Sequence, residues 1–76
     1  MFAKNIFGTR LRELRSQKGI PQKILSELLG VTVTQISDME NGRTFTTIPK
    51  LYLLCEYFNV TADYLLGLSD EPAPLK

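Results

Sequence analysis

The chain has 76 residues, 43% of them hydrophobic and 22% charged, with a net charge of +1. This length suits one small domain, and the apolar fraction is too high for a disordered chain. One cysteine and no histidine exclude an intramolecular disulfide, histidine-based zinc sites and histidine acid–base catalysis. The longest apolar run, residues 51–55, is far too short to span a membrane. We expect a soluble cytoplasmic binding module rather than an enzyme, with no metal, cofactor, membrane contact or small-molecule ligand.

Charge is unevenly distributed along the chain. Residues 1–50 hold eight Lys and Arg against four Asp and Glu, a net charge of +4, whereas residues 51–76 hold one against four, a net charge of −3. A basic part beside an acidic part suits a molecule with one face on a polyanion. Chance scatter of charge over a small surface is the alternative.

The first predicted helix spans about residues 4–18. Phe7, Leu11 and Leu14 recur at the i, i+4, i+7 spacing that places apolar side chains on one face of a helix. Most of the remaining positions are polar or charged. Gly19 follows and ends the helix, because glycine readily takes the left-handed conformation found just after helix C-termini.

A second predicted helix covers about residues 22–29. Pro21 opens it, at a position where a missing backbone N–H does no harm, although proline has no side-chain hydroxyl to cap the helix. Gly30 ends it. The residues expected to face inward share an apolar side chain and helical spacing, and they are Leu25, Leu28 and Leu29.

The third predicted helix, residues 32–40, carries the strongest local signal in the chain. Thr32 at the N-cap and Gln35 three residues later fit a capping box, and apolar residues on either side of the box fit a hydrophobic staple. Gly42 lies just beyond the helix end. Because β-branched residues are dense over residues 31–36, a strand is the alternative there, and the caps favour the helix.

Two shorter helices complete the predicted fold. Thr47 caps a fourth helix with a broad apolar face that runs to Phe58, and Thr61 caps a fifth over residues 62–66, which Gly67 closes. Cys55 lies on the apolar face of the fourth helix and is expected in the core. The sequence thus predicts an all-α domain over residues 1–68. A short flexible tail follows at residues 69–76, which hold two prolines and two acids.

Residues 22–42 contain a spaced pattern typical of two helices joined by a tight turn. Counted from Gln22, a small residue, Ser26, stands fifth and the turn glycine, Gly30, stands ninth. Steeply crossing helices need a small residue where their backbones approach, and the glycine allows the chain to reverse. Apolar residues that bury the shared inner face stand eighth, tenth, fifteenth and eighteenth, namely Leu29, Val31, Ile36 and Met39.

This pattern, closed by Glu40-Asn41-Gly42, resembles the XRE family, the phage-repressor and Cro type of helix-turn-helix protein. The similarity extends to about residues 6–68. The resemblance implies a compact five-helix, lambda-repressor-like DNA-binding domain with the helix-turn-helix at its second and third helices. It also implies a prokaryotic or phage transcriptional regulator that binds double-stranded DNA, usually as a homodimer, with recognition helix 32–40 in the major groove.

The resemblance assigns roles residue by residue. The residues expected to read base edges are Val33, Thr34, Ser37, Asp38 and Gln22. The residues expected to contact phosphates are Gln22, Lys23, Thr32, Asn41, Arg43 and Thr44. For Asp38 and Lys23 a plain solvated surface charge is the alternative interpretation.

Two further roles follow from the same resemblance. Arg15 and Glu40 match a salt bridge that holds the recognition helix to the first helix. The expected dimer contact comprises Tyr64, Leu65 and Leu68. We interpret the chain as a sequence-specific repressor that binds an inverted-repeat operator. The alternative is a protein-interaction module, such as an anti-repressor or antitoxin-like adaptor, which the low net charge would also suit.

Overall fold

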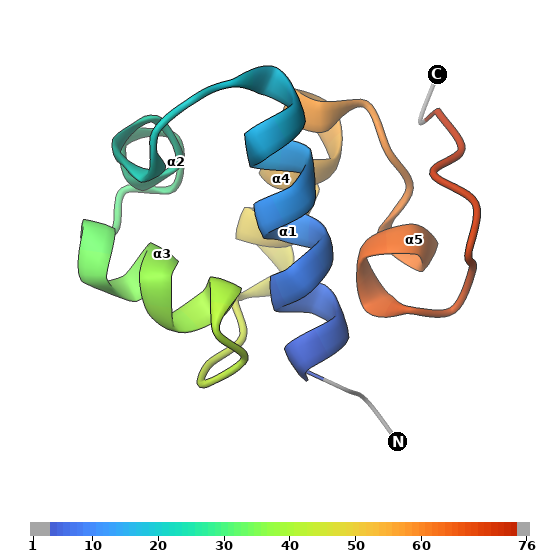
Figure 1. Ribbon diagram of the computed structural model, residues 1–76, viewed down its shortest axis with the longest axis horizontal. Coiled ribbons are helices and arrows are strands. Elements are labelled where there is room, and N and C mark those ends of the chain that lie inside the picture. Colours follow the sequence, from blue (N-terminus) through green and yellow to red (C-terminus); the bar gives the residue numbers. More distant parts are fainter. Residues whose placement is uncertain (1–3, 75–76) are drawn as a thin grey trace.

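The computed structural model describes residues 4–74 and contains five helices packed around one core (Figure 1). Their bounds are α1 Lys4–Lys18, α2 Gln22–Leu29, α3 Val33–Glu40, α4 Ile48–Phe58 and α5 Ala62–Leu66. Helix α1 contacts α3 on one side and α5 on the other, and α2 contacts α3 and α4. The described residues form no strand, so the all-α prediction is confirmed and the strand alternative for residues 31–36 is wrong.

The predicted helix starts are present as hydrogen bonds. Thr32 Oγ1 accepts from the backbone N–H of Gln35 at 3.1 Å, and Gln35 Oε1 accepts from the backbone N–H of Thr32 at 2.8 Å, which completes the capping box. Thr47 and Thr61 cap α4 and α5 through their hydroxyls, which accept from the backbone N–H groups of Lys50 and Tyr64. Pro21 at the start of α2 makes no side-chain cap. Local sequence therefore fixes where three of the helices begin.

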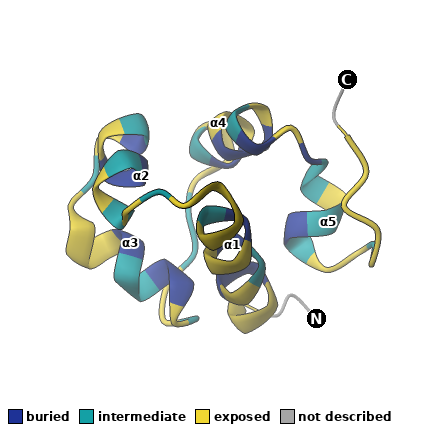
Figure 2. Cartoon of the chain, turned by 45° about the horizontal axis from the view of Figure 1, so that its top comes forward, coloured by how far each residue is buried: buried dark blue, intermediate teal, exposed yellow. Residues whose placement is uncertain are grey.

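The core takes side chains from all five helices, and each helix turns one face toward it (Figure 2). Its buried apolar residues are Phe7, Leu11, Leu14, Leu25, Leu29, Ile36, Met39, Leu51, Leu54, Cys55, Phe58, Val60 and Leu65. As predicted, Cys55 is one of them, and its burial raises the pKa of the thiol. None of the described helices has the length and apolar character needed to cross a bilayer.

Two residues in the structure hold α3 and its following loop against α1. A Cβ added to Gly8 would lie 2.3 Å from the carbonyl oxygen of Met39 and 2.7 Å from that of Glu40, so only glycine fits where the two helices touch. Phe45 packs edge-on against Phe7, with ring centroids 4.9 Å apart. The loop after α3 therefore packs an aromatic ring against the core.

The described residues after α5 run back along that helix (Figure 1). The carbonyl oxygen of Ser69 accepts from Arg10 Nη1 at 2.7 Å, and that of Ala73 accepts from the backbone N–H of Thr61 at 3.2 Å. These contacts attach the segment to both α1 and the start of α5. The domain boundary at residue 68 and the flexibility of the tail stay predictions.

Candidate nucleic-acid interface

Helices α2 and α3 are joined by a turn that reverses the chain within a few residues. Gly30 has φ of +68°, a left-handed conformation that glycine takes without strain, and Val31 donates its N–H to the carbonyl of Ser26 at 3.0 Å. Ser26 is buried, and its hydroxyl donates to the Lys23 carbonyl within α2 at 2.8 Å. The small residue thus satisfies its own polar atom and leaves room for the helix crossing.

Helix α3 has a buried inner face and an exposed outer face. Ile36, Met39 and Glu40 are buried. In contrast, Val33 is 43% exposed, and Thr34 beside it is also exposed. Val33 and Thr34 are therefore accessible at the surface of the first turn of α3. The predicted first-turn readers therefore project from the same end of α3.

The inner face of α3 is tied to α1 through a buried carboxylate. Arg15 Nε lies 2.6 Å from Glu40 Oε2, and Arg15 Nη2 lies 3.1 Å from Glu40 Oε1. The Arg15 guanidinium also donates to the carbonyl of Ile20 at 2.9 Å. The Glu40 side chain is only 2% exposed. Two parallel bonds to a buried carboxylate fix both separation and direction, so the pair sets the orientation of α3 against the scaffold.

Gln22, at the start of α2, joins this network. Its Nε2 donates to Glu40 Oε1 at 3.0 Å. The side chain predicted to contact DNA is therefore held by the carboxylate that anchors α3. This places the N-terminus of α2 beside the C-terminal end of α3, and the role of Gln22 toward DNA stays a prediction.

The second turn of α3 and the loop after it form a local polar network. Asn41 Nδ2 donates to the carbonyl of Ser37 at 2.9 Å and reaches its Oγ at 3.3 Å. Arg43 Nη1 lies 3.4 Å from Asp38 Oδ1. Thr44 follows on the exposed part of the loop. Ser37 and Asp38 are half-buried, and each has a partner in the loop after α3.

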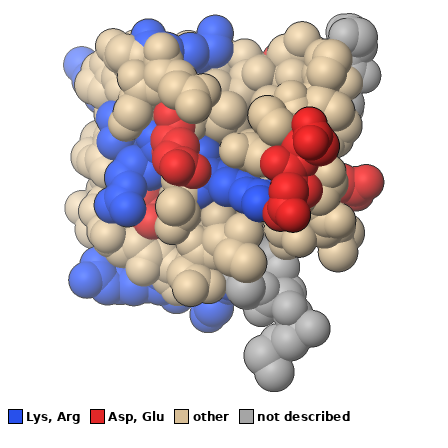
Figure 3. All heavy atoms as spheres, turned by 45° about the vertical axis from the view of Figure 1, so that its right-hand side comes forward, with Lys and Arg blue, Asp and Glu red and all other residues tan. Residues whose placement is uncertain are grey.

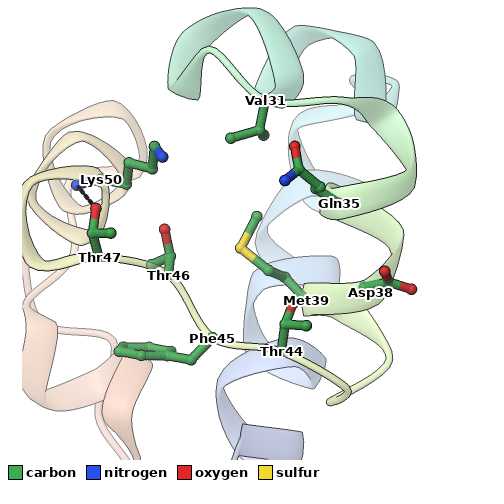
Figure 4. Close-up of a pocket in the computed structure, with 9 residues that line it drawn as sticks. All are labelled: Val31, Gln35, Asp38, Met39, Thr44, Phe45, Thr46, Thr47 and Lys50. Atoms are coloured by element: carbon green, nitrogen blue, oxygen red, sulfur yellow. Dashed lines mark hydrogen bonds between the residues drawn. The ribbon is translucent and has the colours of Figure 1, made fainter.

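A cavity of about 420 Å³ separates α3 from the start of α4 (Figure 4). Gln35 and Met39 point into it from α3, and Lys50 lies across from them on α4. Its lining residues are Val31, Gln35, Asp38, Met39, Thr44, Phe45, Thr46, Thr47 and Lys50. The cavity brings the predicted phosphate contact Thr44 to the same side of the molecule as Lys50, which the sequence reasoning did not select.

The opposite side of α1 carries a different set of contacts. Arg10 Nη1 donates to the carbonyl of Tyr64, its guanidinium lies 4.4 Å from the centroid of the Tyr64 ring, and its Nη2 lies 3.2 Å from Asp70 Oδ1. Figure 3 shows this side, where acidic side chains gather and a basic side chain extends to them. The charged group of Arg10 is therefore bound to partners within the same chain.

The three residues predicted to form the dimer contact differ in exposure. Leu65 is 0% exposed and belongs to the core, so the prediction that its side chain forms a dimer contact is wrong for the folded chain. Tyr64 is half-buried beneath Arg10, and Leu68 is 76% exposed. Leu65 is the buried residue of α5.

The helix pair, with its buried inner face and exposed outer face, defines a helix-turn-helix protein. The sequence profile described as "Helix-turn-helix domain" matches residues 8–71. The chain belongs to this family, in its XRE-type branch, whose members are non-enzymatic DNA-binding domains of transcriptional regulators.

Named relatives of this chain are also helix-turn-helix transcriptional regulators. The HTH-type transcriptional regulator PrpR of Mycobacterium tuberculosis is 33% identical over 69 residues, which are 91% of this chain and 14% of PrpR. YobD of Bacillus subtilis, an HTH-type transcriptional regulator, is 32% identical over 91% of this chain and 62% of its own length. The chain therefore covers about a seventh of the length of PrpR and less than two thirds of the length of YobD.

A solved structure gives the same likeness in three dimensions. The P22 c2 repressor, in complex with a synthetic operator, is 30% identical over 83% of this chain and 96% of its own, with a TM-score of 0.76. The compact five-helix fold implied by the resemblance to XRE proteins is thus confirmed.

Proposed function

We propose that the chain is a sequence-specific, double-stranded DNA-binding regulator that inserts α3 into the major groove. The observation that carries this proposal is the exposed first turn of α3, Val33 and Thr34, on a helix whose inner face is anchored by Glu40. A helix that reads base edges needs an inner face fixed rigidly to the rest of the fold and an outer face exposed to the DNA. Membership of the helix-turn-helix family supports it.

Base discrimination is assigned to the outer face of α3. The Val33 side chain suits contact with a thymine methyl group, and the Thr34 hydroxyl suits a hydrogen bond to a base edge. Ser37 lies one turn further along and is the next reader. These are short side chains, so we expect the helix to approach the base edges closely.

Phosphate contacts are assigned to residues that flank α3. Gln22 and Lys23 lie at the N-terminus of α2, where unpaired backbone N–H groups favour phosphate oxygens. The remaining candidates share an exposed position at either end of α3, and they are Thr32, Asn41, Arg43 and Thr44. With a net charge of +1, non-specific affinity should be modest and fall with salt by about 0.9 in the log–log slope per phosphate contacted.

The proposed assembly is a homodimer on an inverted repeat, with two α3 helices about 34 Å apart. Leu68, highly exposed just after α5, and the half-buried Tyr64 are the residues retained for the contact. Binding over a promoter would block polymerase, so we propose repression rather than activation.

A protein-interaction module is the second candidate. Asp38 beside Arg43 leaves the outer end of α3 without net positive charge, which suits a protein partner as well as DNA. Such a module would keep the fold and show no preference among duplex sequences.

The test is an in vitro selection from random duplex DNA at two salt concentrations. We expect enrichment of an inverted repeat with half-sites one helical turn apart. The matched control is the double variant Val33→Ala/Thr34→Ala, whose exposed substitutions leave the core intact and should abolish enrichment. Salt-sensitive binding with no motif would contradict specific recognition and favour the interaction module.

A further inference from the structure

The surface of α3 and its following loop presents a single pair of charges. Between Lys23 and Lys50 the sequence holds one basic residue, Arg43. Of the two acids in α3, Glu40 is buried against Arg15. Asp38 and Arg43 are therefore the charges that this part of the chain shows to a ligand, and they lie 3.4 Å apart.

The backbone holds the two residues in register. Arg43 donates its N–H to the carbonyl of Asp38 at 2.9 Å. Between them Gly42 has φ of +76° and lies so close to α1 that an added Cβ would be 3.0 Å from the Cα of Asn5. The start of the Arg43 side chain is thus fixed, and the guanidinium, on a side chain 68% exposed, is the part free to swing.

The pair is weak enough to exchange partners. Its single N–O contact is partly exposed, and such exposed pairs contribute little to stability. A duplex offers each member a better partner. Phosphate oxygens accept from arginine, and the exocyclic N4 amino group of cytosine donates to a carboxylate. An unpaired carboxylate near phosphates or near a carbonyl base edge is repelled.

On the basis of the proposed function, we infer that Asp38 is a positioning residue that couples base identity to phosphate contact through Arg43. On a site where a base amino group faces Asp38, the carboxylate accepts a hydrogen bond from that amino group. Arg43 then loses its partner and can contact a DNA phosphate. On other sequences Asp38 keeps Arg43, and the phosphate contact is lost. A charge that opposes DNA binding thereby raises selectivity.

The test measures four proteins on two duplexes over a range of salt. The proteins are wild type, Asp38→Asn, Arg43→Ala and the double variant, and the duplexes are the selected repeat and a scrambled version. Asparagine keeps the shape of Asp38 and removes its charge. Glu27→Gln, on the exposed part of α2, is the control that removes the same charge elsewhere. Equal thermal unfolding midpoints by circular dichroism establish that each variant is folded.

We expect Asp38→Asn to bind the scrambled duplex about two- to fivefold more tightly, with a salt slope steeper by about one, because Arg43 is released. The selected repeat should show no such gain, so selectivity falls. In the Arg43→Ala background the gain on scrambled DNA should vanish. Arg43→Ala alone should weaken binding to the selected repeat far more than to scrambled DNA.

Three outcomes overturn the inference. In the first, Asp38→Asn raises the affinity for scrambled DNA as much in the Arg43→Ala background as in the wild type, which shows that Asp38 acts only by repelling phosphates. In the second, Glu27→Gln gains as much as Asp38→Asn. In the third, selectivity is unchanged by Asp38→Asn. A wild-type protein that does not distinguish the two duplexes is a separate result, since it overturns the proposed function and the coupling with it.

Discussion

The two sides of α1 hold their neighbours by different means. Toward α3, Gly8 brings backbones into contact and Arg15 makes two bonds to a carboxylate that is 2% exposed. Toward α5, Arg10 bonds to carbonyls and to Asp70, whose side chain is 99% exposed. Each side has one arginine paired with one acid, but only the acid on the α3 side, Glu40, is shielded from water.

This difference indicates which motion the fold suppresses. Buried charge pairs are costly to break, whereas exposed ones contribute little. The orientation of α3 against α1 is thus set by buried contacts that cost much free energy to break. The contacts between α1 and the α5 region are weaker. A helix that reads base edges needs such support, because small displacements disrupt its contacts.

Arg15→Met should have the largest effect on stability. Among the described residues, removing the guanidinium leaves Gln22 as the one side-chain donor to the buried Glu40 carboxylate, which we expect to cost about 3–5 kcal/mol. Urea denaturation followed by circular dichroism measures it. Arg12→Met, on the exposed face of the same helix, is the control and should cost less than about 0.5 kcal/mol. Equal losses in the two variants would show that the buried pair has no special role.

Gly8→Ala should destabilise by about 2–3 kcal/mol, because the new methyl group meets backbone atoms that cannot rotate away. The change also alters the distance between α1 and α3, so DNA affinity should fall at temperatures where the variant is folded. Ser16→Ala, on the exposed face of α1, serves as control and should be neutral or slightly stabilising. A Gly8→Ala variant as stable as wild type would rule out a tight crossing.

Arg10→Met should cost about 1–2 kcal/mol, because the carbonyls of Tyr64 and Ser69 lose a charged donor but stay near water. Hydrogen exchange should speed up in α5 and not in α3. The companion variant Asp70→Asn removes only the exposed carboxylate and should cost less than about 1 kcal/mol. Faster exchange in α3 would contradict the separation of the two sides.

Local signals made much of this fold predictable. Thr32 with Gln35, Thr47 and Thr61 define helix starts through hydrogen bonds within a few residues, and Gly30 defines a turn through its own φ. The Arg15–Glu40 assignment came instead from resemblance, since residues 25 positions apart carry no local signal of contact.

What the sequence left open depends on where helices meet. Gly8 lies within a helical pattern, where glycine is usually only unfavourable, and its reason is the backbone of α3. Arg10 carries no local sign of its partners, because the carbonyls that it bonds belong to Tyr64 and Ser69, more than 50 residues further along the chain. The resemblance placed Leu65 in a dimer contact, yet its side chain fills the core. Each depends on packing between distant segments.

The most direct test of the account compares Thr34→Ala with wild type on the selected repeat and on scrambled DNA. If the first turn of α3 reads base edges, the variant loses about 1–3 kcal/mol on the repeat and almost nothing on scrambled DNA, with an unchanged unfolding midpoint. Equal losses on both duplexes, or none on either, would contradict base readout by α3.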